Sequence, residues 1–164
     1  MPTPVSIRER IERQLLENLK DTPGIGACSR WDARGIGRYP HLGGFILAGD
    51  DRVDEAAMGN NYDVTTKTLD VTAGVVLYHS ESATIPTAQL ANLWMALVEE
   101  KIMSDPQLIE TSTGKRLAVD IRCVGTIAPD YTQGRTAAGV RFEVMYDHYR
   151  DDPFAGPGLS KMTE

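Results

Sequence analysis

One stretch near the middle of the chain, residues 86–104 (PTAQLANLWMALVEEKIMS), carries apolar residues at the spacing of an α-helix. They recur at steps of three and four and form one stripe: Leu90, Leu93, Trp94, Leu97, Val98 and Ile102. Because such a stripe must be buried and the flanking segments are strand-like, we expect this helix to lie across one face of a β-sheet. Aromatic residues in an apolar stripe are usually buried, so Trp94 is predicted to lie in the core.

A second helix is predicted over residues 6–20. Ser6 and Glu9 have the spacing of a capping box, in which each side chain satisfies an amide of the first turn. An apolar stripe with a four-residue step begins with Ile7 and Ile11, and an Asp-Thr-Pro-Gly sequence then ends the helix. This stripe also requires a buried partner surface.

Five segments have the alternation or the short apolar run of β-strands: 26–33, 41–49, 66–79, 117–127 and 140–149. A polar loop over 128–139 separates the last two, which we expect to form an antiparallel pair. Within the second segment, Gly43-Gly44 indicates a bulge or a close backbone contact.

The predicted order is helix, strand, strand, strand, helix, strand, strand. This order indicates an α+β fold with one mixed or antiparallel sheet of about five strands and two helices packed on it. Residues 1–150 are expected to form this single domain. Residues 151–164 are rich in Pro and Gly and poor in apolar residues, so we expect an extended or disordered tail.

The composition is that of a globular protein. With 164 residues, 41% hydrophobic and 24% charged, the chain suits one domain that needs no disulfide or metal to fold. Cys28 and Cys123 match no metal or redox spacing and are interpreted as reduced core thiols. No apolar run reaches the roughly 18 residues of a membrane span, and no signal-peptide core precedes the first helix, so we expect a cytoplasmic protein that does not bind a membrane.

The charge is negative and unevenly distributed. A net charge of −6, from 17 basic and 23 acidic residues, argues against a surface that wraps nucleic acid. Residues 49–63 (the acidic segment) contain one base, Arg52, and five acids: Asp50, Asp51, Asp54, Glu55 and Asp63. With its turn residues this segment is long for a hairpin connection, so we predict a loop that has a function or is simply solvated.

Motifs of catalysis or cofactor binding are incomplete. The glycines at 35–37 lack the third glycine of a dinucleotide fingerprint, and the sequence at 112–115 lacks the full spacing of a phosphate loop. The histidines do not have the mutual spacing of a metal site: His41, His79 and His148.

A hydrolase would require a pocket that joins Asp32, Asp120 or His148, which could meet only across the sheet. Charged residues on the open face of a sheet are more often solvated or at a subunit interface. We therefore expect no enzyme, no cofactor and no metal.

A succession of short pieces carries a family resemblance. After the first helix and its Pro-Gly come IMSDPQL at 102–108, AVDIR at 118–122 and GVRFEVMY at 139–146. Over most of residues 6–149, this succession resembles the tail terminator (tail completion, minor tail) proteins of long-tailed bacteriophages. The chain departs from that pattern in the acidic segment and beyond Arg150.

The resemblance implies a structural virion protein that forms a homo-oligomeric ring, commonly a hexamer, at the head-proximal end of a tail tube. Such a ring ends tube polymerisation and offers an attachment surface for the head, so the implied partners are the tail tube protein and the head-tail connector protein. No sequence-specific binding of nucleic acid is expected. The implied location is the virion tail, with the host cytoplasm as the place of assembly.

A ring around DNA gives the acidic segment a possible role, because carboxylates that face a lumen repel phosphates. We predict that this segment faces the lumen or the neighbouring subunit. The predicted lumen or interface residues are Asp50, Asp51, Asp54, Glu55, Asp63, Asp120, Arg122 and Arg141.

Two other functions fit the same sequence. A head-tail joining (neck) protein would also form a ring, on the connector side. A small-ligand or peptide-binding α+β domain would instead have a concave apolar pocket and would be a monomer or dimer. Stoichiometry separates the ring-forming functions from the binding domain.

Overall fold

The computed structural model describes residues 1–31, 43–59, 62–78, 86–132 and 134–164. Its helices are α1 (Ile7–Lys20), α2 (Glu55–Met58) and α3 (Thr87–Met103). Its strands are β1 (Pro4–Val5), β2 (Ala27–Arg30), β3 (Gly43–Val53), β4 (Val64–Tyr78), β5 (Asp120–Thr132), β6 (Arg135–Tyr149) and β7 (Met162–Thr163).

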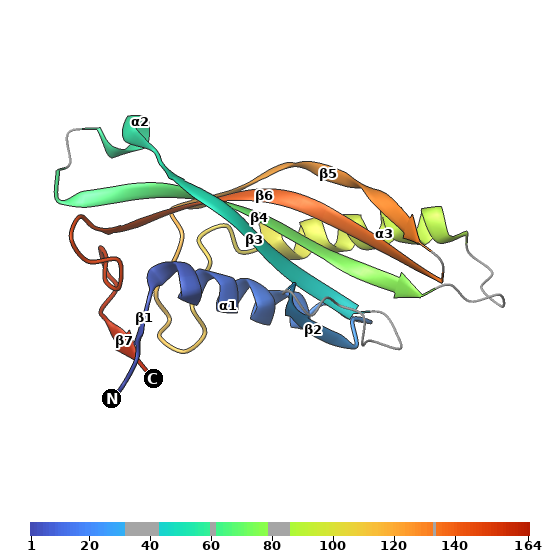
Figure 1. Cartoon of the computed structure of the whole chain (residues 1–164), viewed down its shortest axis with the longest axis horizontal. Coiled ribbons are helices and arrows are strands. Elements are labelled where there is room, and N and C mark those ends of the chain that lie inside the picture. Colours follow the sequence, from blue (N-terminus) through green and yellow to red (C-terminus); the bar gives the residue numbers. More distant parts are fainter. Residues whose placement is uncertain (32–42, 60–61, 79–85, 133) are drawn as a thin grey trace.

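The predicted α+β fold is confirmed. Five strands form one sheet in the order β2-β3-β4-β6-β5, and β1 and β7 form a small separate pair. The pair β2 and β3 is parallel, whereas all other neighbours in the large sheet are antiparallel, so that sheet is mixed. Figure 1 shows the long, twisted strands β4 and β6 at its centre, with α2 at the end opposite to β2.

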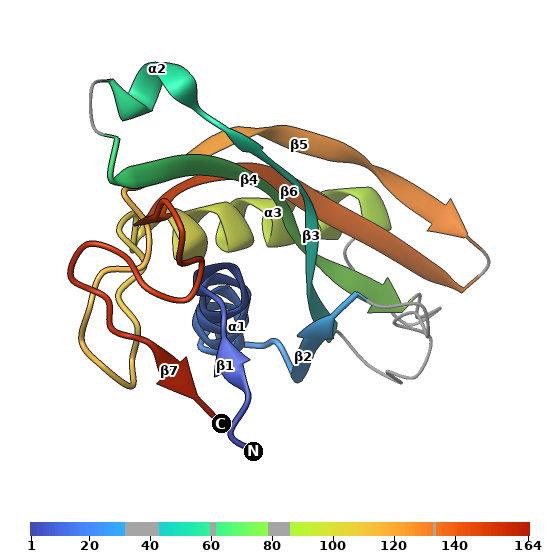
Figure 2. The same ribbon diagram turned by 60° about the vertical axis from the view of Figure 1, so that its left-hand side comes forward.

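Both long helices lie on the same face of the sheet, beneath it in Figure 2. Alternate residues of the central strands point toward these helices and are fully buried, including Val75 and Val140. They form one core cluster with Ile11 of α1 and Val98 of α3. The two apolar stripes therefore share a single core, as expected for helices that cover one face of a sheet.

The first helix begins as predicted. The Ser6 hydroxyl accepts a hydrogen bond from the Glu9 amide at 3.1 Å. The second half of the capping box is absent, because the Glu9 carboxylate accepts hydrogen bonds from Arg13 and Arg30 instead. Glu9 therefore fixes β2 against α1.

The central helix is confirmed, and its predicted buried stripe is correct in part. Of the predicted residues, Val98 and Ile102 are buried, and Ala91 and Met95, which were not predicted, are buried with them. Leu93 is 49% exposed, and Trp94 is only partly buried, with its ring against Gly24. Apolar residues cover more than half of the circumference of α3, so the spacing alone does not determine which part faces the sheet.

The predicted strands are longer than expected at the hairpin of β5 and β6. Residues 128–132 and 135–139, predicted as loop, continue the two strands. Irregularities in register at Cys123/Gly125 and at Ile127/Asp130 interrupt β5 without ending it. The predicted close contact at Gly43-Gly44 is confirmed for Gly44, where a Cβ atom would lie 2.7 Å from the Cys28 sulfur.

The expected tail after residue 150 is packed and not disordered. Ala155 and Leu159 are buried, and Leu159 belongs to the main core. The last residues form β7 antiparallel to β1, where the Thr3 amide donates to the Glu164 carbonyl at 2.7 Å. Pro and Gly here make turns, with Gly158 at a φ of 75°, so the composition that suggested disorder instead folds the tail back on the domain.

Candidate functional site

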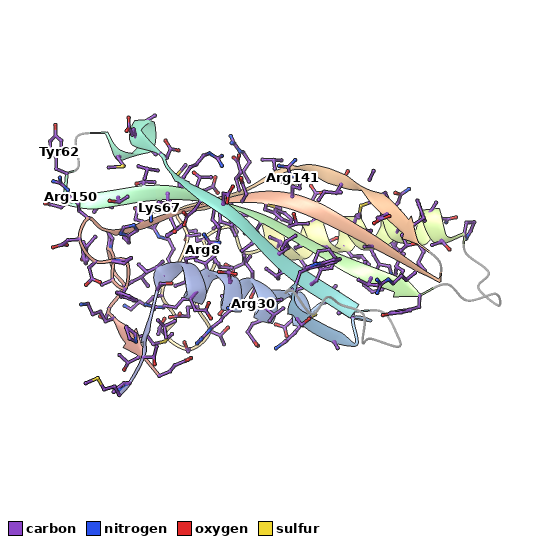
Figure 3. The ribbon with its side chains drawn as sticks, viewed as in Figure 1. Arg8, Arg30, Tyr62, Lys67, Arg141 and Arg150 are labelled. Carbon is purple, nitrogen blue, oxygen red and sulfur yellow. The ribbon has the colours of Figure 1, made fainter. Side chains whose placement is uncertain are left out.

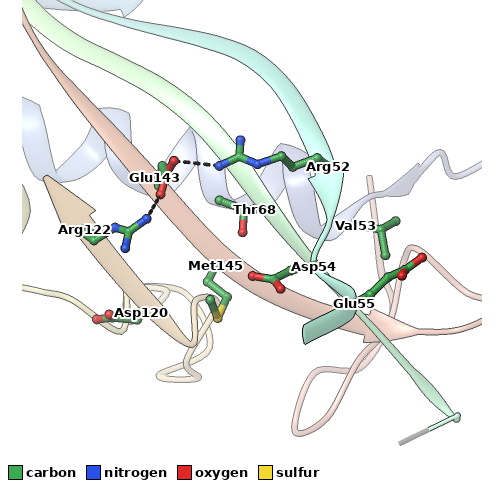
Figure 4. A pocket seen from close by; sticks show the side chains of 9 residues that line it. All are labelled: Arg52, Val53, Asp54, Glu55, Thr68, Asp120, Arg122, Glu143 and Met145. Carbon is green, nitrogen blue, oxygen red and sulfur yellow. Dashed lines mark hydrogen bonds and ion pairs between the residues drawn. The ribbon is translucent and has the colours of Figure 1, made fainter. Parts of the chain in front are cut away.

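The face of the sheet opposite the helices (the open face) carries a row of charged residues. Arg52 donates to Asp70 at 3.1 Å. It also donates to Glu143 at 2.7 Å, and Arg122 donates to Glu143 as well (Figure 4). Strand register places them together, since Glu143 lies opposite both Asp70 and Arg122. The hydrogen bond from Arg122 and the one from Arg52 lower the pKa of Glu143, although partial burial opposes this. The network therefore stays charged at neutral pH.

A hollow of about 490 Å³ (the charged hollow) lies on the open face at the α2 end of the sheet. Its lining residues come from β3, the start of α2, and strands β4, β5 and β6: Arg52, Val53, Asp54, Glu55, Thr68, Asp120, Arg122, Glu143 and Met145 (Figure 4). Charged groups dominate this lining, since it contains negative carboxylates and positive guanidinium groups. Such a surface suits a charged protein partner better than an apolar small molecule, whose sites are mostly apolar.

A second, apolar hollow of about 190 Å³ lies on the open face toward the β2 end (the open-face groove). Its apolar lining comprises Trp31, Phe45, Leu47, Ile127 and Ala137. Trp31, Leu47 and Ile127 are each about 40% exposed, at 39%, 40% and 43%. The Trp31 ring meets the edge of Phe45 with ring centroids 4.8 Å apart. Sequence reasoning did not identify this surface.

Phe45 is placed by two glycines on the neighbouring strands. Gly74 and Gly139 lie directly opposite each other in the pair β4 and β6. A Cβ atom on Gly74 would lie 2.7 Å from the Phe45 ring and 2.1 Å from the Ala138 carbonyl oxygen. The missing side chains let the ring lie flat on the sheet, which forms the floor of the open-face groove.

The acidic segment is not the loop that was predicted. Strand β3 continues through it to Val53, and α2 follows at once. A register shift between Ala48 and Asp51 turns Asp51 to the helix-covered face. There its carboxylate accepts a hydrogen bond from the Tyr146 hydroxyl at 2.8 Å and pairs with Arg8 at 3.4 Å. Partial burial favours the neutral acid, but Tyr146, Lys67 and Arg8 together lower the pKa of Asp51.

The other acids of the segment have separate environments. Asp54 caps α2 by accepting a hydrogen bond from the Ala57 amide at 3.0 Å. Asp50 and Glu55 are exposed, and Glu55 lines the charged hollow. Asp63 is exposed just before β4, and its carbonyl accepts from the Arg150 amide at 2.9 Å. The five acids thus do not form one cluster.

The remaining predicted residues lie on the open face. Asp120 and Arg122 line the charged hollow. Arg141 is exposed next to the open-face groove (Figure 3) and has no ion-pair partner within the part of the chain that the structure describes. The antiparallel pairing of β5 and β6, as predicted, brings Arg122 to Glu143 on this face.

The residues considered for a hydrolase do not converge. Asp32 lies outside the described residues. Asp120 points to the open face, whereas His148 is 6% exposed and follows the buried alternation of β6. The His148 Nδ1 lies 2.6 Å from the Tyr149 carbonyl oxygen. Asp120 and His148 are thus on opposite faces of the sheet.

Other kinds of site were also considered for the described residues. They contain no group of three or more His, Cys, Asp or Glu side chains arranged to hold a metal ion. None of the described helices has both the length and the apolar character needed to cross a membrane. Comparison with protein-family models and with curated proteins gives no match.

Proposed function

We propose that this chain is a structural subunit that joins copies of itself head to tail in a closed ring. One observation supports this most: apolar side chains are exposed on two opposite sides of the domain. The open-face groove lies on one side, and the exposed part of α3 around Leu93 lies on the helix-covered side. The groove gathers exposed Trp31, Leu47 and Ile127 in one place, and gathered apolar residues of this kind mark protein interaction surfaces.

Two different surfaces on opposite sides favour a head-to-tail contact. A two-fold dimer uses the same surface on both copies and would leave the second patch exposed. A heterologous contact uses both and produces a ring when the rotation closes, or a filament when it does not. The tail terminator resemblance of the sequence points to the closed form, commonly a hexamer.

In this proposal the ring sits at the head-proximal end of a phage tail tube, where it ends tube polymerisation and binds the head. Its partners are then the tail tube protein and the head-tail connector protein, and it is a virion protein assembled in the host cytoplasm. The charged hollow, with four carboxylates and two guanidinium groups, offers a polar surface for one of these partners.

A second candidate function is that of a ligand-binding domain. The observation in its favour is that the surface has two concave regions, the charged hollow and the open-face groove. The charged hollow has the volume of a ligand pocket, but its lining is mainly ionic. The apolar groove, at about 190 Å³, falls below the roughly 300–1,000 Å³ of typical ligand pockets. The ring proposal accounts for both surfaces with a single mode of assembly.

The function is tested on polymerising tail tubes. The purified chain is added to a polymerising tail tube protein, and tube lengths are measured by electron microscopy. The proposal predicts that tubes stop growing and carry extra density at one end, at a molar ratio of about six copies per tube. Tubes of unchanged length without bound protein would contradict it.

A further inference from the structure

Helix α3 carries leucines outside its buried stripe: Leu90, Leu93 and Leu97 (the α3 flank). Leu93 is 49% exposed, Leu97 is half-buried, and Leu90 is partly buried against the core. Glu100 follows Leu93 by seven residues and Leu97 by three, so it continues the same line along the helix. Glu100 is exposed and has no ion-pair partner among the residues described.

The open face shows the complementary order of groups. The open-face groove contains exposed Trp31, Leu47 and Ile127, and Gly139 forms part of its floor. Two residues farther along β6 comes Arg141, about 7 Å away at the rise of a strand. An apolar hollow is thus followed by a positive charge that has no ion-pair partner among the residues that the structure describes.

Pairing through the strand edges is a weaker alternative for this chain. The free edge of β5 is interrupted by register shifts, contains Pro129 and has Gly125 at a φ of 141°. Bulges and proline are devices that protect edge strands from pairing with other chains. At the opposite edge, β2 has only four residues. The faces are therefore better suited to association than the edges.

We infer that the α3 flank of one copy docks in the open-face groove of the next, with Glu100 paired to Arg141. This inference rests on the proposed function, because it names the contact that builds the ring. The partner is a second copy, since the chain itself carries both halves of the contact, a row of leucines ending in a carboxylate and an apolar hollow ending in a guanidinium.

The dimensions of the two surfaces agree. From Leu93 to Glu100 the helix rises about 10 Å, at 1.5 Å per residue. The groove floor and Arg141 are about 7 Å apart along β6, and a flexible arginine side chain spans the remaining distance. Leu93 and Leu97 can therefore lie over the groove while Glu100 meets Arg141. The open-face groove and the α3 flank share no lining residue with the charged hollow, although Arg141 lies two residues from Glu143 of that hollow. The α2 end of the charged hollow thus stays available to another partner.

The test is a charge exchange between the two surfaces. Arg141→Glu and Glu100→Arg are each prepared, and assembly is followed by sedimentation velocity over a concentration series and by microscopy of tail tubes mixed with each sample. Each variant places like charges at the contact, so the concentration for half-assembly should rise by roughly 30-fold or more. Arg150→Glu, an exposed charge reversal just after β6, is the matched control and should assemble like the wild type.

Restoration makes the test specific. The double variant Arg141→Glu/Glu100→Arg should assemble again, because opposite charges meet at every contact. An equimolar mixture of the two single variants should assemble as well, since each copy then finds the opposite charge on both neighbours. Circular dichroism melting of each variant checks that the monomer is folded, and a folded single variant that fails to assemble supports the interface.

The outcomes separate the interface from the function. If both single variants assemble like the wild type, the proposed contact between the α3 flank and the open-face groove is wrong, but the proposed ring assembly is not contradicted. If the double variant and the mixture fail although the single variants are folded, the pairing of Glu100 with Arg141 is overturned. If the wild type forms no ring and does not bind tubes, the proposed function fails and the interface fails with it.

Discussion

The buried ion pair between Arg10 and Glu110 joins parts of the chain that are distant in sequence. Arg10 donates to both carboxylate oxygens of Glu110, at 2.7 and 2.6 Å, and to the Ser160 carbonyl at 2.9 Å. The Thr113 hydroxyl also donates to Glu110 at 2.6 Å. Both charged side chains are nearly inaccessible to solvent. The pair thus connects α1, the turn after α3 and the packed tail.

Replacing Glu110 with Gln should lower the free energy of unfolding by about 3–5 kcal/mol, because it leaves the Arg10 charge buried without its partner. Urea unfolding at pH 7 measures this. Glu17→Gln is the control, since it removes an exposed pair with Lys20 and should change stability by less than about 1 kcal/mol. Equal effects of the two substitutions would contradict the structural role of Glu110.

The same pair should make stability depend on pH. The hydrogen bonds and charge of Arg10 lower the pKa of Glu110 in the folded state, against the effect of burial. The stabilisation is therefore fully present above the unfolded pKa of about 4.3 and is lost as the pH falls through the lower folded pKa. The difference in unfolding free energy between the wild type and Glu110→Gln should be constant above about pH 5 and shrink toward pH 3. A difference that does not change over this range would disprove the coupling.

The facing glycines under Phe45 provide a second prediction for single residues. Gly74→Ala places a methyl group against the Ala138 carbonyl oxygen and the Phe45 ring, so the unfolding free energy should fall by about 3 kcal/mol. Gly49→Ala in β3 is the matched control, because its Cβ atom would have ordinary contacts of 3.5 Å or more. Thermal unfolding compares the two variants, and a Gly74→Ala protein as stable as the control would be incompatible with the described floor of the groove.

Among the elements, β3 differs most from its prediction, because its continuation past Ala48 uses Asp51 as an internal group. Asp51→Ala should cost about 1–3 kcal/mol, since the buried Tyr146 hydroxyl loses its acceptor. In a Tyr146→Phe background the same substitution should cost less, which a double-mutant cycle measures. Asp50→Ala is the exposed control and should change stability by less than about 0.5 kcal/mol.

The packed tail gives a prediction of the same kind. Leu159→Ala removes a buried side chain of the main core and should lower the unfolding free energy by about 2–4 kcal/mol. Leu93→Ala removes an equal volume from the exposed surface of α3 and should leave monomer stability within about 0.5 kcal/mol while weakening assembly. Equal melting temperatures of the Leu159→Ala protein and the wild type would mean that the tail does not support the core.

Sequence periodicity predicted best the elements whose apolar residues all lie on one face, because only that face can then be buried. The alternation of β4 to β6 and the four-residue step of α1 each specify one buried face. In α3, Leu93 and Val98 are both apolar, so the pattern does not select one face, and tertiary packing buries the face that carries Ala91, Met95, Val98 and Ile102. The inward turn of Asp51 depends on a bulge, and the open-face groove depends on Gly74 and Gly139 lying opposite each other. Both depend on strand register, which the sequence pattern does not specify.

At the scale of the whole molecule, the distribution of exposed groups is the main feature. The helix-covered side carries the α3 flank, and the open face holds the apolar groove near β2. The charged hollow lies near α2 (Figure 4). In the proposed ring, the opposed apolar surfaces would form the head-to-tail contacts, and the charged hollow would remain for a different partner. This arrangement would let one small domain both close a ring and bind the structures above and below it.

The exposed acids Asp50 and Glu55 are the residues of the acidic segment that remain free to act in such a ring. If they face the DNA path, Asp50→Asn/Glu55→Gln should leave the stability of the monomer and the ring unchanged while lowering infectivity, because phosphates are no longer repelled. Particle yield and infectivity, measured together, test this. Unchanged infectivity would mean that the two acids are only solvated.

The most direct test of the ring is the mass of the purified protein, measured by light scattering over a concentration series with negative-stain images of the same samples. The proposed function predicts closed rings of about six subunits, in free solution at high concentration or on the ends of added tail tubes. A protein that stays monomeric at high concentration and does not bind tail tubes would contradict it and would favour a ligand-binding domain.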